Sequence, residues 1–280
     1  MQKDSTYYLT TSANLDIDQF IQNKHQLVKT TITGRMSHKV IAVKDTLYTM
    51  DVAYQSLKMN MEIGGNAINF DSNGDTTNVF SKLMSRLTGK AFTLVMSKRG
   101  QIVTIQNTEK LFQNILDGFP QLDEQKKSQL LAQVKQSFGE KAIKGNFQES
   151  FVIFPKIPIA VKNTWTVQTV IDAVAISTKT NTIYTLNKIT DKYYDISGAA
   201  IVEAGKVPAF KSTNGYLARL NNIAGSTNTT IKIDNKTGWI LESKVIKHIK
   251  GTMEMKKTTD EPILMSYPMV VNGILTNTGN

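Results

Sequence analysis

Hydrophobic and polar residues alternate along most of the chain, which is the pattern of a β-strand with one buried face. The clearest case is residues 46–63, in which Leu57, Met59 and Met61 alternate with polar side chains such as Lys58. Similar stretches surround it, so the first half predicts an antiparallel meander. The stretches predicted as strands here and further along are 6–15, 26–43, 46–63, 91–96, 101–106, 165–177, 181–190, 193–202, 216–223 and 263–275.

A spacing of about 3.6 residues replaces this alternation in two places and predicts helices. In residues 78–87, Leu83 lies at the centre of an i, i+4, i+8 series of apolar residues. A larger helical insert is predicted at 108–151, where three consecutive segments each carry an apolar stripe. Phe112 and Leu116 belong to the first stripe, which ends before a proline.

The second half is organised around a long hairpin in residues 225–255. Ile231 and Ile233 alternate with polar residues up to a turn at 234–238, Asp-Asn-Lys-Thr-Gly. Asp and Asn bond to their own backbone in turns, and Gly adopts positive φ without strain. A second run without Pro or Gly then begins at Trp239. This stretch reads as scaffolding rather than as a catalytic loop.

A Pro-containing link divides the chain. Pro155 and Pro158 exclude both a helix and a central strand there. We therefore expect an N-terminal part, 1–153, with the meander and the helical insert. A C-terminal antiparallel half, 154–280, packs against it, and the two could equally form one continuous domain. Residues 93–103 resemble residues 231–241 with one extra residue in the turn. An internal duplication and a chance match between meanders both remain open.

The predicted fold class is α+β, with mainly long antiparallel β-strands forming a curved sheet or half-barrel and the helical insert around 108–151 covering one face. Helices laid across a curved sheet leave a hollow that suits an apolar or amphiphilic ligand. Methionine adapts to such pockets, although it also fills cores. The residues predicted to line the hollow are Leu57, Met59, Met61, Leu83, Phe112, Leu116 and Trp165.

The net charge of the 280-residue chain is +10, and the positive charge is concentrated near the C-terminal hairpin. Lys244, Lys247 and Lys250 are predicted to form a basic face of the sheet there. No aromatic-rich stacking motif or Arg cluster accompanies them, so nucleic acid is not an expected partner. Lysine spread along strands also protects sheet edges from aggregation.

Motifs for catalysis or metal binding are missing from the sequence. There is no cysteine, and His25, His38 and His248 lie far apart without a metal-ligand spacing, so they read as exposed residues. No Gly-x-Ser-x-Gly elbow, phosphate loop or dinucleotide fingerprint occurs. We therefore predict no catalytic residue, no metal and no cofactor, and we expect that the protein is not an enzyme. No apolar run reaches about 18 residues, so no transmembrane segment is predicted.

Three stretches carry a likeness to a known family. They are residues 89–102, residues 154–165, which read Phe-Pro-Lys-Ile-Pro-Ile-Ala-Val-Lys-Asn-Thr-Trp, and residues 231–243. With the order of strands, helical insert and Pro-containing link, they make the chain resemble an uncharacterised family of secreted proteins and lipoproteins from Bacteroidota, a domain of unknown function. Asn163 stands where that pattern leads us to expect Gly, and Asn also tolerates positive φ.

The resemblance implies an extracytoplasmic location, in the periplasm, as an outer membrane lipoprotein or at the cell surface, with a lipid anchor upstream of Met1 as one option. It assigns no catalytic residue. The leading hypothesis is a non-catalytic cell-envelope protein that binds a lipid-like small molecule or another envelope component in the sheet–helix hollow. The alternatives are a structural or adhesion-type surface protein and, third, an envelope hydrolase.

Overall fold

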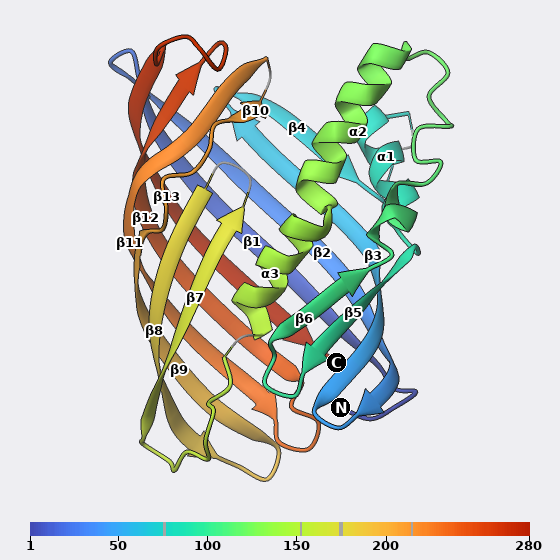
Figure 1. The fold of residues 1–280 in the computed structure, drawn as a ribbon, viewed down its shortest axis with the longest axis vertical. Helices are drawn as coiled ribbons and strands as arrows, with labels where there is room; N and C mark the ends of the chain where they lie inside the picture. The colour runs from blue at the N-terminus through green and yellow to red at the C-terminus, as the bar shows by residue number, and fades with distance from the viewer. Residues whose placement is uncertain (75–76, 152, 174–175, 214) are drawn as a thin grey trace.

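A computed structural model describes residues 1–74, 77–151, 153–173, 176–213 and 215–280. Within these residues thirteen strands form one large, curved antiparallel sheet, and the helices lie against its concave face (Figure 1). The strands are β1 (Thr6–Ile21), β2 (Lys24–Lys44), β3 (Leu47–Ile63), β4 (Asn66–Asp71), β5 (Ala91–Ser97), β6 (Ile102–Gln106), β7 (Thr164–Ala173), β8 (Ile176–Ile189), β9 (Tyr193–Ala204), β10 (Lys211–Thr213), β11 (Tyr216–Asp234), β12 (Ile240–Lys256) and β13 (Met265–Gly279).

In the described residues four helical segments accompany the sheet: α1 (Val79–Leu87), the 3₁₀ helix η1 (Thr108–Phe112), α2 (Glu124–Phe138) and α3 (Glu140–Phe151). The Asn78 side chain caps α1 by accepting hydrogen bonds from the next turn, and Asp123 caps α2 in the same way. The predicted α+β class, with a curved sheet and a helical insert, is therefore confirmed.

The strand order follows the chain in both directions from the pair β1–β13. It runs β6-β5-β3-β2-β1-β13-β12-β11-β9-β8-β7, with β4 added to β3 and β10 to β11. The edge strands β6 and β7 are joined in sequence by η1, α2 and α3. Helix α3 packs against both of these edge strands. The helical insert therefore bridges the open side of the sheet (Figure 1).

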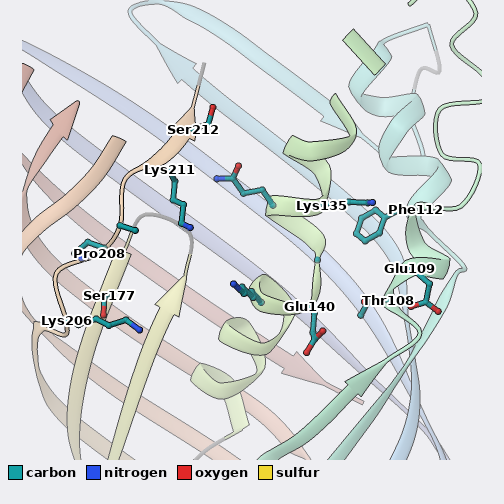
Figure 2. Close-up of a pocket in the computed structure, with 14 residues that line it drawn as sticks. Thr108, Glu109, Phe112, Lys135, Glu140, Ser177, Lys206, Pro208, Lys211 and Ser212 are labelled. Carbon is teal, nitrogen blue, oxygen red and sulfur yellow. The ribbon is translucent and has the colours of Figure 1, made fainter. Parts of the chain in front are cut away.

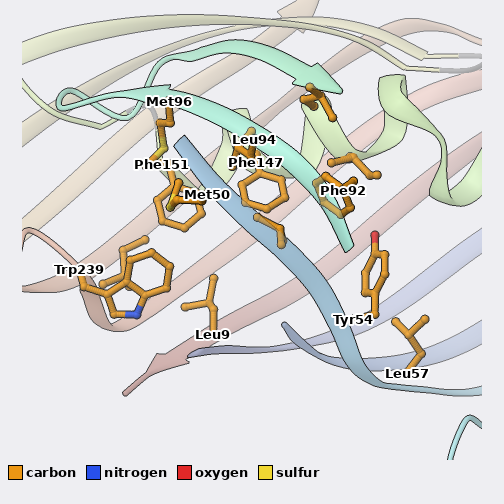
Figure 3. Close-up of a cluster of buried hydrophobic side chains, with 14 of the residues drawn as sticks. Leu9, Met50, Tyr54, Leu57, Phe92, Leu94, Met96, Phe147, Phe151 and Trp239 are labelled. Atoms are coloured by element: carbon orange, nitrogen blue, oxygen red, sulfur yellow. The ribbon is translucent and has the colours of Figure 1, made fainter. Parts of the chain in front are cut away.

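One core fills the space between the lower part of the sheet and the helices. Its largest members include Phe92, Met50 and Leu94 from the sheet and Trp239 from the turn before β12, together with Phe147 from α3 (Figure 3). A second, smaller cluster consists of strand residues alone, built around Val202, Leu220, Ile223 and Met269. Burial of apolar area at these two places is the main stabilising term.

The sequence predicted most strands but missed two short ones and several ends. β4 and β10 both lie outside the stretches in which the alternation predicts a strand. The stretch 216–223 is expected to be either a separate strand or part of a long one entering the hairpin, and the structure shows the second: it is continuous with the first hairpin strand as β11. The helix expected to reach residue 119 is regular only as the short η1. Both sides of the Pro-containing link contribute to the same sheet, and the proposed division at 153/154 stays a prediction.

Candidate functional site

An apolar surface covers the middle of the concave face, and the pairing register defines it. The strand partners Val245, Leu275, Ala13, Ile32, Met59 and Phe70 form one row across six strands. The next row is Lys247, Gly273, Leu15, Thr30, Met61 and Ile68. The third is Ile249, Val271, Ile17, Val28 and Ile63. We call these three rows the apolar face.

The apolar face is only partly covered by protein. Ile32 and Ile68 keep 39% and 47% of their surface exposed. Met59, Met61, Leu15 and most of the other row members are half-buried. A contiguous apolar surface of this kind, left partly exposed to water, is typical of a binding site.

A pocket lies where the apolar face passes under the helices. It has a volume of about 250 Å³, and we call it the helix–sheet pocket. Ala13, Ile32 and Leu275 of the first row line it, so the pocket opens onto the apolar face. Its other lining residues include Leu9, Thr11, Met36, His38, Tyr54 and Leu57 from the sheet and Phe138, Ile143, Phe147 and Phe151 from the helices.

His38 is the most unusual residue of this pocket. It is completely buried, and neither ring nitrogen has a hydrogen-bond partner in the described part of the chain. Its ring lies edge-on to Trp239, Phe147 and Phe151, with centroids 4.9, 5.6 and 6.2 Å away. Desolvation lowers the pKa of His38 to about 3, and an interaction with the backbone of Tyr7, which does not meet the geometry of a hydrogen bond, acts in the opposite direction. The imidazole is therefore uncharged at neutral pH.

Tyr54 and a polar chain supply hydrogen-bonding groups on the sheet side of the pocket, and Ser137, Asn146 and Ser150 line it from the helices. Burial raises the pKa of Tyr54, whose ring lies edge-on to Phe138 on α2 with centroids 5.8 Å apart. The Thr11 hydroxyl donates to Asn277 Oδ1 at 2.6 Å, and Asn277 Nδ2 donates to Ser243 Oγ at 2.8 Å. These polar groups are few and fixed, as in pockets that orient a mainly apolar ligand.

Lys247 corrects the predicted basic face. Side chains alternate along β12 without a bulge from 242 to 255, so Lys244 and Lys250 lie on the convex face. Lys247 lies on the concave face, opposite Gly273 in the second row. The spacing of three residues between neighbouring lysines alternates their faces, so the three cannot share one. Desolvation lowers the pKa of Lys247 to about 8.

A wider cleft lies between the helical insert and the segment 206–212, and we call it the lysine-rich cleft. Its volume is about 750 Å³, and it extends from η1 and the α2–α3 junction to the segment around β10 (Figure 2). Lys135, Lys141, Lys206 and Lys211 line it, with Glu109 and Glu140 as the acidic residues. All six side chains are exposed, so their charges are screened by water and salt.

The predicted ligand-binding residues are spread over several places. Leu57 lines the helix–sheet pocket, Phe112 lines the lysine-rich cleft, and Met59 and Met61 lie on the apolar face. Leu83 is fully buried in the core, against which Leu116 packs. Trp165 stacks on Tyr184 with ring centroids 5.5 Å apart. The structure therefore does not bring the seven residues into one cavity, and their role in binding stays a prediction.

Sequence reasoning missed His38, which it read as exposed. His25 and His248 are exposed as expected, but His38 has no accessible surface. The alternation in β2 carried the signal, because His38 occupies the same face as Met36 and Val40, both apolar. In the described residues no group of three or more His, Cys, Asp or Glu side chains is placed to hold a metal ion. None of the helices there is long and apolar enough to cross a membrane.

The fold and site define a class of protein: a wide antiparallel sheet whose concave face is apolar and bridged by a helical insert. The chain belongs to the family described as Family of unknown function (DUF6263), whose sequence model matches residues 45–240. The expected membership of an uncharacterised family is thus confirmed. No curated protein matches the chain in sequence.

Among solved structures, the chain is similar to lipovitellin, whose structure is described in terms of lipid–protein interactions in lipovitellin. The TM-score is 0.51 at 9% identity, and the match covers 100% of this chain and 25% of the lipovitellin chain. The chain thus spans a quarter of the length of that relative, and the likeness concerns the fold alone. The outer membrane protein OprG from Pseudomonas aeruginosa is also matched, over 100% of this chain and 97% of OprG, at 6% identity. Its TM-score of 0.27 is too low to support any argument.

Proposed function

We propose that this is a non-catalytic protein of the cell envelope that holds a hydrophobic or amphiphilic ligand against the apolar face. The observation that carries the proposal is that most members of the three rows of the apolar face are half-exposed, over five strands in one row and six in the other two. Covering such a surface with an aliphatic chain gains roughly 25 cal/mol per Å² of apolar area removed from water.

The shape of the site supports a long ligand. From His38 to Ile32, at the end of the helix–sheet pocket that meets the apolar face, β2 advances six residues, or about 20 Å at the usual rise of a strand. One acyl chain spans about half of the roughly 30 Å hydrocarbon thickness of a bilayer, and the distance along β2 exceeds that half. The fold shared with lipovitellin, a protein studied for its lipid interactions, agrees with this ligand class.

The envelope location and the absence of catalysis belong to the same proposal. The location rests on the likeness to secreted proteins and lipoproteins described above. The absence of catalysis is supported by two groups of the pocket: the Thr11 hydroxyl donates to an asparagine, and the His38 nitrogens contact no hydroxyl group in the described residues, so these two do not form a pair of nucleophile and base.

Native mass spectrometry of the purified protein, followed by organic extraction, tests the proposal. The expected result is a bound mass of lipid size that is released by the solvent. Titration of the delipidated protein with N-phenyl-1-naphthylamine, an uncharged probe that fluoresces in apolar sites, gives a second readout. Saturable binding is expected in both cases, and its absence from both would exclude a ligand-binding role and favour a structural or adhesion-type protein.

A matched pair of variants locates the binding surface. Met61→Asp places a carboxylate on the apolar face, and Asn60→Asp places the same group one residue earlier, on the convex face of β3. We expect Met61→Asp to weaken probe binding at least tenfold, because a carboxylate in an apolar contact must be desolvated. Asn60→Asp should change it less than twofold. Equal effects of the two variants would place binding elsewhere on the molecule.

A further inference from the structure

The helix–sheet pocket contains a buried hydrogen-bonding group that the protein itself leaves unused. Both nitrogens of His38 lack a partner in the described residues, although a buried polar group without a hydrogen bond destabilises the folded state. The residue also lines a pocket of about 250 Å³, larger than the roughly 150 Å³ cavity that admits benzene in a well-studied engineered case. A residue that only filled the core would have been less costly as an apolar side chain.

We propose that the helix–sheet pocket seats the hydroxyl end of an uncharged aliphatic ligand against His38, while the aliphatic chain lies along the apolar face. This inference rests on the proposed function and specifies its ligand class. It differs from the usual arrangement in which the polar end of an amphiphile stays at the surface.

The chemistry of His38 selects an alcohol over an ion. A neutral imidazole has one N–H donor and one acceptor nitrogen, and a hydroxyl group offers both counterparts. An anion would favour a protonated imidazole, but the surrounding rings of Phe147, Phe151 and Trp239 disfavour that charge. A carboxylate would also have to be desolvated on entering the pocket.

The geometry requires a side-chain movement on α3. Phe147 and Phe151 stack on each other, with centroids 5.6 Å apart, and they cover one side of His38. His38 has no surface that water can reach, so a ligand must displace one of these rings to contact the imidazole. Asn146 and Ser150 also line the pocket from α3, beside the path of the ligand.

Competition between three probes of equal chain length tests the inference. Decan-1-ol carries the hydroxyl group, 1-chlorodecane carries no strong hydrogen-bonding group, and decanoate carries a charge. Each probe is titrated into the delipidated protein with bound N-phenyl-1-naphthylamine at pH 7.5, and the loss of fluorescence is measured. Decan-1-ol should compete at about tenfold lower concentration than 1-chlorodecane, as expected for one buried group gaining its partner. In His38→Phe this preference should fall within twofold, whereas His25→Phe, at an exposed position, should keep it.

Imidazole ¹⁵N NMR of the unsubstituted protein gives a test that does not depend on a variant folding. The three histidines give separate signals, and His25 and His248 are the internal controls. Decan-1-ol should shift the His38 signals saturably, and 1-chlorodecane should not produce that hydrogen-bond shift. The inference is overturned if both probes compete equally, if decanoate competes best, or if the preference survives His38→Phe; the proposed function stands in each of these cases. Failure of all three probes to compete would also overturn the inference, whereas the proposed function falls only if native mass spectrometry and the fluorescent probe both show no saturable binding.

Discussion

The indole Nε1 of Trp165 donates a hydrogen bond of 2.8 Å to the backbone carbonyl of Ile153. Ile153 follows α3, and Trp165 is the second residue of the edge strand β7. The bond therefore fixes the end of the helical insert to the side of the sheet that lacks a strand partner. Ile153 is almost fully buried and the hydrogen bond is partly buried, so water replaces the lost donor poorly.

Trp165→Phe is expected to destabilise the protein by about 1–3 kcal/mol, the usual effect of leaving a buried carbonyl without its donor. The phenyl ring can still stack on Tyr184, so packing is largely kept. Chemical denaturation measures the loss, and hydrogen exchange shows where it acts. Exchange should increase in α3 and remain unchanged in α1. An unchanged free energy of unfolding would show that the hydrogen bond does not secure the insert.

His38 predicts a specific loss of stability in acid. Its pKa is lowered from about 6.5 in the unfolded chain to about 3 in the folded state, so the unfolded chain binds the proton more readily between these values. Stability must therefore fall as the pH drops from 6.5 towards 3, with a slope of up to about 1.4 kcal/mol per pH unit from this residue. His38→Phe should flatten the measured curve over that window, and His25→Phe should not.

The lowered pKa of Lys247 predicts how the stability of the protein changes at alkaline pH. Its pKa is lowered from 10.5 to about 8, so the unfolded chain holds the proton more tightly between these values. Stability should accordingly rise as the pH increases from about 8 to 10.5. Lys247→Met removes this contribution, and Lys244→Met, on the convex face of the same strand, is the matched control. Denaturation at several pH values should show the difference, and parallel curves for wild type and Lys247→Met would contradict it.

Two turn glycines form a test of close packing. Gly100 and Gly238 have similar positive φ angles, 78° and 72°. A Cβ atom at Gly100 would lie 1.8 Å from the carbonyl oxygen of Phe151, whereas a Cβ at Gly238 would meet nothing within 4 Å. Gly238→Ala should cost about 1 kcal/mol from backbone strain alone. Gly100→Ala should cost clearly more, because the end of α3 must move. Thermal unfolding of the two variants compares them directly.

Most strands could be predicted from the sequence because the alternation of apolar and polar residues is a local signal. Leu57, Met59 and Met61 follow period two, and the register indeed places all three on the concave face. Short elements were lost for the same reason: β4, with its exposed residues, has little burial pattern to read. Its Gly-rich approach and polar ends resemble a loop until β3 supplies the pairing partner.

The site could be predicted only in outline. The hollow between sheet and helices followed from amphipathic patterns, but the members of a pocket depend on which strands become neighbours. Pairing of β1 with β13 joins residues near the two chain ends, such as Leu15 and Gly273, and no local pattern announces it. The position of Lys247 was recoverable, since counting residues along β12 separates it from Lys244 and Lys250.

The β1–β13 pairing also means that the chain ends meet. The Tyr8 amide donates to the Asn280 carbonyl at 2.8 Å, and the Asn280 amide donates to the Tyr8 carbonyl at 3.2 Å. A circular permutant could therefore connect residue 280 to residue 1 through a short linker and begin instead between η1 and α2. Every strand would keep its neighbours, and the order of synthesis would change so that β13 and β1 become a hairpin. The strand order of the sheet therefore does not depend on where the chain begins, and the helical insert is a suitable place for new chain ends.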